Sequence, residues 1–499
     1  METLILLLSG LETALQPTNL VFALLGCVVG TLVGILPGVG PVAGTAILLP
    51  LTFKLDPIPA IIMLSAIYYG AMYGGTITSV LMNVPGEAAS AITCLDGYEM
   101  AKQGRGGPAL AIAAIGSFFG GTVATMGLVF LAIPLTRFAL TFGPPEIFSL
   151  LVVGLSLVTG LAGTSLVRGL ISAIFGLLIA MIGIDPVVGA PRFTYHVVQL
   201  LDGVGIVPVA MGLFGIAEVF LNVESDILGT VIGTKLKDLI PSARDTRVST
   251  LPVLRGTAIG FFIGLIPGMN SVVPTVMSYI AEKRFSKTPE KFGTGMIEGV
   301  AGPETANNAY ANAALIPLFT LGIPGSPTVA ILMGVFMMNG LIPGPLLFKE
   351  NPHFVWTVIA SLYVGNVILL ILNLPLIPLW VTVLKIPKSI LYAFISGFCV
   401  LGAYSLNNSV FDVAVMIVFG VLGYFFKKVD IPSAPILLTL VLGPMVEQAL
   451  RQSLDISQGD FSVFFSRPIS AALLAIAALF LIVSGLRITT SVRGQDSEV

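Results

Sequence analysis

Long apolar stretches separated by short polar segments make up most of this chain of 499 residues. A helix that crosses a membrane needs about 20 apolar residues, because it rises 1.5 Å per residue through a core ~30 Å thick. The pattern therefore predicts an all-α polytopic membrane protein with about 11–12 spans. The expected spans are residues 58–95, 108–136, 146–163, 168–184, 197–222, 304–340, 354–384, 390–404, 409–426, 431–450 and 468–486.

Two other apolar stretches, residues 20–53 and 252–281, are interrupted in the middle by Pro-Gly pairs, Pro37-Gly38 and Pro267-Gly268. A helix stops at such a pair, because proline lacks a backbone donor and glycine tolerates almost any backbone angle. Each flanking arm of about 14–17 residues reaches roughly 21–25 Å, which passes the middle of a membrane without crossing it. We therefore expect two re-entrant helical hairpins.

A second kind of break comes after each hairpin. The sequence NVPGE at 83–87 interrupts the helix expected at 58–95, and GIPGS at 322–326 interrupts the helix expected at 304–340. Because the same order of hairpin and broken helix recurs after an odd number of crossings, the sequence predicts two inverted-topology repeats. The expected organisation is a first repeat at 1–222, a cytoplasmic connector at 223–251, a second repeat at 252–450, and a last span with a cytoplasmic tail at 451–499.

Composition and charge agree with a membrane location. Only 10% of the residues are charged and 56% are hydrophobic, whereas a soluble protein carries about 25% charged residues. On the expected topology most of the 24 Lys and Arg residues fall on one face, which the positive-inside rule assigns to the cytoplasm. The two hairpins then enter from opposite faces, and the C-terminus is cytoplasmic. No segment resembles a nucleic-acid-binding patch.

Paired breaks in the two halves of a membrane chain are typical of a transporter's binding site. These breaks predict how an anionic substrate would be bound. A half-helix that begins just after each Pro-Gly would point free N–H groups and the positive end of its dipole into the protein. No Lys or Arg lies near the breaks, so we expect backbone N–H groups and small polar side chains to hold the substrate. A bulky residue at Gly86 or Gly325 should then block transport without disturbing assembly. The candidate substrate-binding residues are Pro37, Gly38, Val39, Gly40, Asn83, Pro85, Gly86, Pro267, Gly268, Pro324, Gly325 and Ser326.

Carbonyl, amide and carboxylate oxygens around the same breaks suit a hard cation such as Na⁺. The candidate cation-binding residues are Gly38, Asn83, Glu87, Asn270, Ser271, Glu304, Asn307 and Asn308. Gly40-Pro41 stands in the first hairpin where Asn270-Ser271 stands in the second, so we expect Na⁺ coupling to depend more on the second. Glu218 and Glu447 lie near expected loop boundaries and are interpreted as structural. No organic cofactor is expected.

Several of these motifs resemble those of the TctA family, the large membrane subunit of bacterial tripartite tricarboxylate transporters. The resemblance rests on LPGVGP at 36–41, IPGMNS at 266–271 and the run at 282–348, which contains GPETANNAY. It implies a Na⁺-driven importer of citrate-like or other small carboxylates in the bacterial inner membrane, with elevator-type movement. It also implies two partners, a small TctB-like membrane subunit and a periplasmic TctC-like substrate-binding protein.

Two other transport functions stay open at the level of the sequence. The chain could be an ion-coupled carboxylate carrier that works without a binding protein, or an ion channel with re-entrant loops. Hairpins that enter from opposite faces favour a carrier over a channel. An intramembrane enzyme is disfavoured, because the chain contains neither a Gly-x-Ser-x-Gly nor a His-Glu-x-x-His motif.

Overall fold

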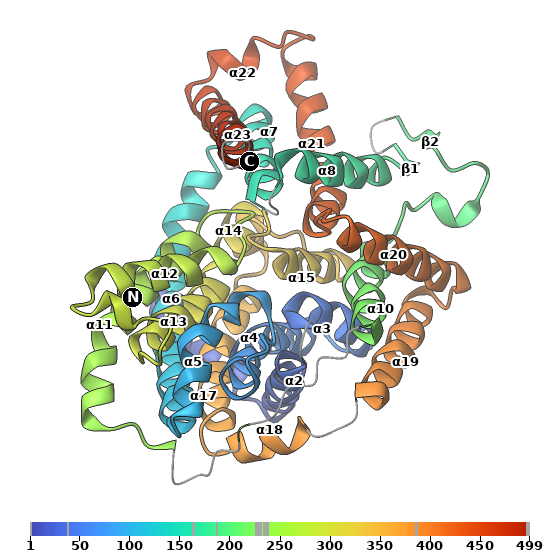
Figure 1. Cartoon of the computed structure of the whole chain (residues 1–499). Coiled ribbons are helices and arrows are strands. Elements are labelled where there is room, and N and C mark those ends of the chain that lie inside the picture. Colours follow the sequence, from blue (N-terminus) through green and yellow to red (C-terminus); the bar gives the residue numbers. More distant parts are fainter. Residues whose placement is uncertain are drawn as a thin grey trace.

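A computed structural model describes residues 2–36, 39–161, 165–185, 188–224, 232, 239–384 and 388–495 of the chain. These residues form a helical bundle, apart from a short antiparallel ladder of two strands (Figure 1). The expectation of an all-α polytopic membrane protein is confirmed, since seven helices in the described part are long and apolar enough to cross a membrane. They are α2 (Pro17–Ile35), α4 (Pro57–Met82), α6 (Gly106–Ala139), α9 to α10 (Ile206–Glu224), α17 (Pro352–Leu372), α20 (Val410–Lys428) and α21 (Ala434–Ile456). The helix at Ile206–Glu224 consists of α9 (Ile206–Ala210), the π-helical turn η4 (Met211–Ile216) and α10 (Ala217–Glu224).

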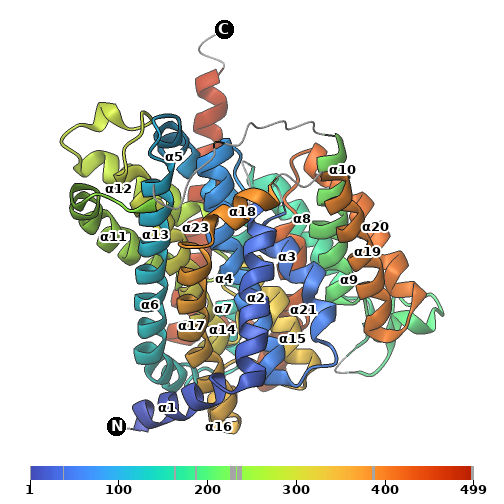
Figure 2. The same cartoon turned by 90° about the horizontal axis from the view of Figure 1, so that it is seen from below.

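The remaining elements complete the described chain. They are α1 (Glu2–Ala14), α3 (Gly40–Leu48), η1 (Leu49–Thr52), η2 (Ala88–Ala91), α5 (Thr93–Lys102), α7 (Pro144–Leu161), α8 (Leu166–Ala180), β1 (Gly183–Ile184), β2 (Pro191–Arg192), η3 (Val198–Leu200), α11 (Ala243–Gly264), α12 (Val272–Phe285), η6 (Pro289–Lys291), α13 (Glu298–Ala313), α14 (Leu315–Leu321), α15 (Pro327–Met338), α16 (Pro345–Glu350), α18 (Ile377–Val383), α19 (Lys388–Asn407), α22 (Val463–Ser466) and α23 (Pro468–Gln495). In Figure 2, α1 and α16 lie at one end of the bundle, and α5, α10 and the C-terminus lie at the other.

Both interrupted apolar stretches form a helix, a break and a second helix. In the first stretch α2 ends at Ile35 and α3 begins at Gly40, which has a φ of 63°, while Pro37 and Gly38 lie outside the described residues. In the second stretch α11 ends before a turn in which Gly268 has a φ of 79°, and α12 comes next. Glycine adopts these positive φ angles at no steric cost, so both turns depend on it.

The first arm of each hairpin packs on the broken helix that follows the hairpin, α2 on α4 and α11 on α13. Each contact is made by a stripe of three glycines spaced four residues apart. A β-carbon on any of these glycines would press against a backbone carbonyl of the partner helix, so the two helix backbones are in direct contact. In α2 the glycines Gly26, Gly30 and Gly34 face the carbonyls of Met63, Ile67 and Ala71 of α4. In α11 the glycines Gly256, Gly260 and Gly264 face those of Gly302, Ala306 and Tyr310 of α13. The two halves therefore pack in the same register.

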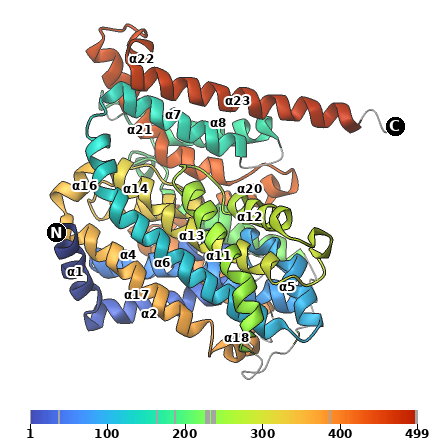
Figure 3. The same cartoon turned by 90° about the vertical axis from the view of Figure 1, so that its left-hand side faces the viewer.

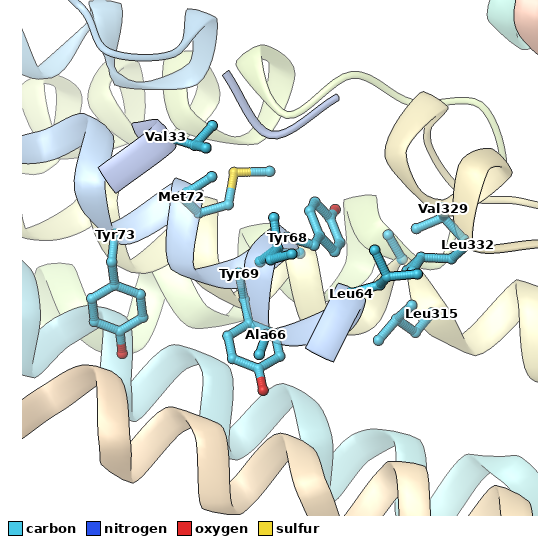
Figure 4. Close-up of a cluster of buried hydrophobic side chains, with 14 of the residues drawn as sticks. Val33, Leu64, Ala66, Tyr68, Tyr69, Met72, Tyr73, Leu315, Val329 and Leu332 are labelled. Atoms are coloured by element: carbon cyan, nitrogen blue, oxygen red, sulfur yellow. The ribbon is translucent and has the colours of Figure 1, made fainter. Parts of the chain in front are cut away.

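The broken helices lie at the centre of the molecule. Every residue of the apolar window of α4 is buried, and its tyrosines Tyr68, Tyr69 and Tyr73 point into the surrounding helices (Figure 4). All described residues of α13 from Gly299 to Ala313 are buried as well. Polar side chains and interrupted backbone are tolerated at membrane depth only where protein surrounds them, and both helices meet that condition.

A second group of helices, α7, α8, α21 and α23, lies to one side of this centre (Figure 1). Figure 3 shows α23 running alongside α7. The loop between α8 and α9 is joined to α21 by a ring of four charges. Arg451 lies 2.9 Å from Asp185 and 2.6 Å from Glu447, and Arg192 lies 2.7 Å from Glu447 and 3.4 Å from Asp185. Glu447 is thus a structural partner, as its position near a loop suggested.

Candidate functional site

One cavity of about 540 Å³ brings together the two hairpin tips and the two broken helices. Segments nearly 300 residues apart in the sequence therefore share one wall. Eight of the residues expected to bind substrate or cation line the cavity. They are Val39 and Gly40 from the first tip, Pro85 and Glu87 from the first break, Gly268, Asn270 and Ser271 from the second tip, and Ser326 from the second break.

The two breaks end their helices in the same way. Asn83 and Gly322 adopt left-handed conformations, with φ angles of 57° and 71°. In each case the N–H of the next residue is hydrogen-bonded to a carbonyl six residues back, 3.5 Å away at Thr78 and 3.3 Å away at Pro317. This geometry terminates a helix, and the proline that comes next prevents the helix from resuming at once.

The segments after the two breaks differ. After the second break Ser326 caps α15, because its Oγ accepts a hydrogen bond from the Val329 N–H at 3.3 Å. After the first break Glu87 and Ser90 cap only η2, a 3-10 turn of 4 residues, and α5 begins at Thr93. The expectation of a half-helix directly after each Pro-Gly is therefore right for the second break and wrong for the first.

The second hairpin tip is bonded to the second broken helix. The N–H of Gly268 donates a hydrogen bond to the carbonyl of Gly325 at 3.1 Å, and the hydroxyl of Tyr310 donates one to the carbonyl of Met269. The Oδ1 atom of Asn270 accepts a hydrogen bond from the N–H of Val272, the first residue of α12, at 3.1 Å. The tip therefore has a defined position relative to the break.

Behind the cavity wall lies a buried polar network that links the two halves. Asn307 donates from Nδ2 to Oε1 of Glu87 at 2.5 Å. The carboxylate of Glu304 accepts hydrogen bonds from the hydroxyls of Thr76, at 2.5 Å, and of Thr93. Glu87 and Glu304 are 4% and 1% exposed, so these hydrogen bonds replace hydration that burial has removed.

Asn308 extends this network to α6, since its Nδ2 donates to the Ser117 hydroxyl at 2.8 Å. The Oδ1 atoms of Asn307 and Asn308 are buried and have no hydrogen-bond donor within the described part of the chain. Buried carbonyl oxygens of this kind are suitable ligands for a hard cation. Of this network, Glu87 also lines the cavity, whereas Glu304, Asn307 and Asn308 do not.

Other predicted site residues lie away from the cavity surface. Asn83 is an exposed helix cap, and Pro267, Pro324, Gly86 and Gly325 are not among the lining residues. The first tip's Pro37 and Gly38 fall outside the described residues.

Gly86 and Gly325 face protein backbone instead of open space. A β-carbon at Gly86 would meet the Gly34 carbonyl and would lie 2.7 Å from the α-carbon of Gly75. One at Gly325 would lie 3.1 Å from the α-carbon of Ala314. The expectation that a bulky residue at either position leaves assembly intact is therefore wrong.

The structure also adds residues that the sequence did not single out. Phe214, Glu218 and Lys427 line the cavity, so the expectation that no basic residue lies near the breaks does not hold in three dimensions. Glu218, expected to be structural, forms an ion pair with Lys427. Phe214 belongs to a π-helical turn, Met211–Ile216, which shifts the face that the rest of the helix presents. No pattern in the sequence marked that turn.

Comparisons with known proteins identify the family of the chain. The family model described as tripartite tricarboxylate transporter TctA family matches residues 20–438. A protein of Agrobacterium vitis, described as an uncharacterized 52.8 kDa protein in the TAR-I ttuC' 3' region, is 46% identical over 490 residues, covering 98% of this chain and 97% of that protein. A second protein of that species, from the TAR-II ttuC' 3' region, is 47% identical over 240 residues, which is 48% of this chain and 98% of that protein. No solved structure matches the chain.

The family match includes both hairpins, both breaks and every residue that lines the cavity. The first of the two relatives extends the likeness over nearly the whole chain. The resemblance inferred from the motifs is therefore confirmed, and the chain belongs to the tripartite tricarboxylate transporter TctA family.

Proposed function

We propose that this chain is the carrier subunit of a secondary active transporter that imports small carboxylates, citrate-like tri- or dicarboxylates, together with Na⁺. One observation supports the proposal above all others, namely that both tips and both breaks line a single cavity. A volume of about 540 Å³ falls within the roughly 300–1,000 Å³ range of small-molecule sites. The N-terminus of α15, which is capped by Ser326, would face a substrate carboxylate there. The N-terminus is the positive end of the helix dipole, so it favours an anion.

In this proposal Na⁺ binds among oxygens of the cavity wall and of the polar network directly behind it. The carboxylate of Glu87, the carbonyls of the second tip and the amide oxygens of Asn307 and Asn308 are the candidate ligands. A cation at this position would also offset the negative charge of the substrate, so substrate affinity should rise with Na⁺ concentration.

The proposed architecture is two inverted repeats that work by an elevator-type movement. Three features support the repeat, which are the glycine stripes of equal register, the left-handed residues that end both broken helices, and the hairpin before each of them. The proposed location is the bacterial inner membrane. The end of the bundle that holds α5, α10 and the C-terminus would face the cytoplasm (Figure 2).

The proposed partners are a small TctB-like membrane subunit and a periplasmic TctC-like binding protein that delivers the substrate. The test is uptake of radiolabelled citrate, succinate and other small carboxylates into vesicles containing this chain and the small subunit. Uptake is measured with and without an inward Na⁺ gradient, and with and without the binding protein. We expect saturable uptake that requires both.

Each arm of this experiment has its own meaning. Uptake that persists without the binding protein would identify a stand-alone carrier. Uptake that does not depend on the Na⁺ gradient but depends on a proton gradient would show that the coupling ion is H⁺. A flux that does not saturate with substrate would indicate a channel.

A further inference from the structure

Three of the described residues that line the cavity carry a formal charge, and Lys427 is the only basic one among them. The other two are Glu87 and Glu218. Glu87 is engaged by Asn307, at 2.5 Å, and Glu218 is paired with Lys427. A substrate with several carboxylates would therefore enter a cavity that already holds two carboxylates, and Lys427 is the basic side chain available there to balance the added charge.

The geometry of the Lys427 and Glu218 pair allows the lysine to change partners. Lys427 lies in the last turn of α20, and its side chain is 36% exposed, whereas that of Glu218 is 14% exposed. Lysine is a compact charge on a flexible stem of four carbons, so its ammonium can move while the helix stays in place. Glu218 would keep a hydrogen bond from Nδ2 of Asn222, 3.2 Å away, if the lysine left.

We propose that Lys427 is a specificity-determining residue that exchanges partners during transport. Its ammonium pairs with Glu218 when the cavity is empty and with a second or third carboxylate of the substrate when the cavity is loaded. The inference rests on the proposed function and deepens it. It names the group that distinguishes a substrate with several carboxylates from one with a single carboxylate.

The neighbouring residue provides a matched control. Lys428 pairs with Glu224, in side chains that are 47% and 48% exposed, and neither residue lines the cavity. The two lysines are adjacent in one helix turn and both bind an acid of α10. They differ in whether the side chain reaches the cavity.

The test measures the concentration of unlabelled citrate, succinate or lactate that halves uptake of a labelled carboxylate. It uses vesicles holding the full chain with its small subunit and binding protein. Lys427→Ala should raise this concentration about tenfold for citrate, the size expected for losing a hydrogen bond to a charged group, and leave lactate nearly unchanged. Lys428→Ala should change neither. Glu218→Gln should lower the value for citrate, because it removes the group that competes for the lysine.

A purely structural ion pair predicts another pattern, in which Lys427→Ala and Glu218→Gln impair uptake in the same direction. That result, or a Lys427→Ala carrier with the wild-type ratio of citrate to lactate inhibition, would overturn the partner exchange. Melting temperatures of the purified variants separate loss of folding from loss of recognition. If the wild-type vesicles take up no carboxylate at all, the proposed function itself fails, and the partner exchange fails with it.

Discussion

Asn307 of α13 donates a hydrogen bond from its Nδ2 to Oε1 of Glu87, 2.5 Å away, and so joins the helix before the second break to the residue after the first. Both side chains are buried, at 0% and 4% exposure. The acceptor lines the cavity and the donor does not, so this bond connects the cavity wall to the polar network behind it.

Removing this hydrogen bond should lower the apparent affinity of the carrier for Na⁺. In Asn307→Ala the carboxylate of Glu87 loses a donor, and the polar network behind the cavity wall loses an amide oxygen. We expect the Na⁺ concentration for half-maximal uptake to rise by roughly ten- to a hundredfold, from the loss of roughly 1.5–3 kcal/mol. Asn373→Ala is the control, since Asn373 is also buried but its amide donates within its own helix segment, to Leu369. An unchanged Na⁺ dependence in Asn307→Ala would remove Asn307 from the cation site.

The second hairpin tip should matter more for Na⁺ than the first. Asn270 and Ser271 line the cavity with side-chain oxygens, whereas Gly40 and Pro41 offer only backbone carbonyls. Asn270→Ala and Ser271→Ala should therefore raise the Na⁺ concentration needed for half-maximal uptake. Asn270→Ala should also lower the melting temperature, because the first N–H of α12 loses its acceptor, and one hydrogen bond contributes about 1 kcal/mol. If both variants keep wild-type Na⁺ dependence, the cation ligands lie elsewhere.

The glycine stripes predict that an alanine substitution in either stripe lowers the stability of the protein by a similar amount. Gly30→Ala and Gly260→Ala each place a methyl group against a carbonyl of the partner helix, so the helices must separate or shift. We expect each to destabilise the protein by about 1–3 kcal/mol, as overpacked cores do. Gly397→Ala is the control, because a β-carbon there meets nothing within 4 Å and alanine favours a helix. Thermal unfolding in detergent measures all three, and a Gly30→Ala variant as stable as Gly397→Ala would contradict the close packing.

The ring of four charges should contribute more to stability than an exposed ion pair. Arg451→Gln leaves Asp185, whose side chain is 6% exposed, with one arginine fewer, and we expect a loss of about 1–2 kcal/mol. Arg168→Gln breaks a pair with Asp430 in which both partners are exposed, at 42% and 75%, and should cost less than about 1 kcal/mol. Equal losses in the two variants, measured by thermal unfolding at low salt, would contradict this ranking.

The positions of the interruptions could be predicted from the sequence, because Pro and Gly act locally. Pro85 and Pro324 mark the ends of their helices in the structure as they do in the sequence. Residues at the hairpin tips and at the breaks were expected to bind substrate or cation, and eight of them line one cavity. The conformation of the chain beyond each break could not be predicted, since the choice between the turn at Glu87 and the helix capped by Ser326 depends on packing around each segment.

The position of Lys427 and Glu218 on the cavity could not be predicted from the sequence. They are separated by 209 residues, and each lies near the end of an apolar helix, where charged residues are common. Their position on the cavity depends on how α10 packs against α20, which in turn depends on a π-helical turn. Gly86 and Gly325 show the same limit, because a glycine that faces a ligand and one that faces a neighbouring helix look alike in a sequence.

The cavity wall has a thermodynamic consequence for any ligand. Many of its lining residues have no rotatable side-chain torsion to lose, namely Gly40, Pro41, Pro85, Ala88, Gly268, Pro327, Pro432 and Ala434. Ordering a flexible side chain on binding costs about 0.5–1.5 kcal/mol of conformational entropy, and for Gly, Ala and Pro this cost is close to zero. The part of the wall formed by these residues therefore needs little ordering when a ligand binds, and the ordering cost is confined to the rotatable side chains that also line the cavity, such as Lys427.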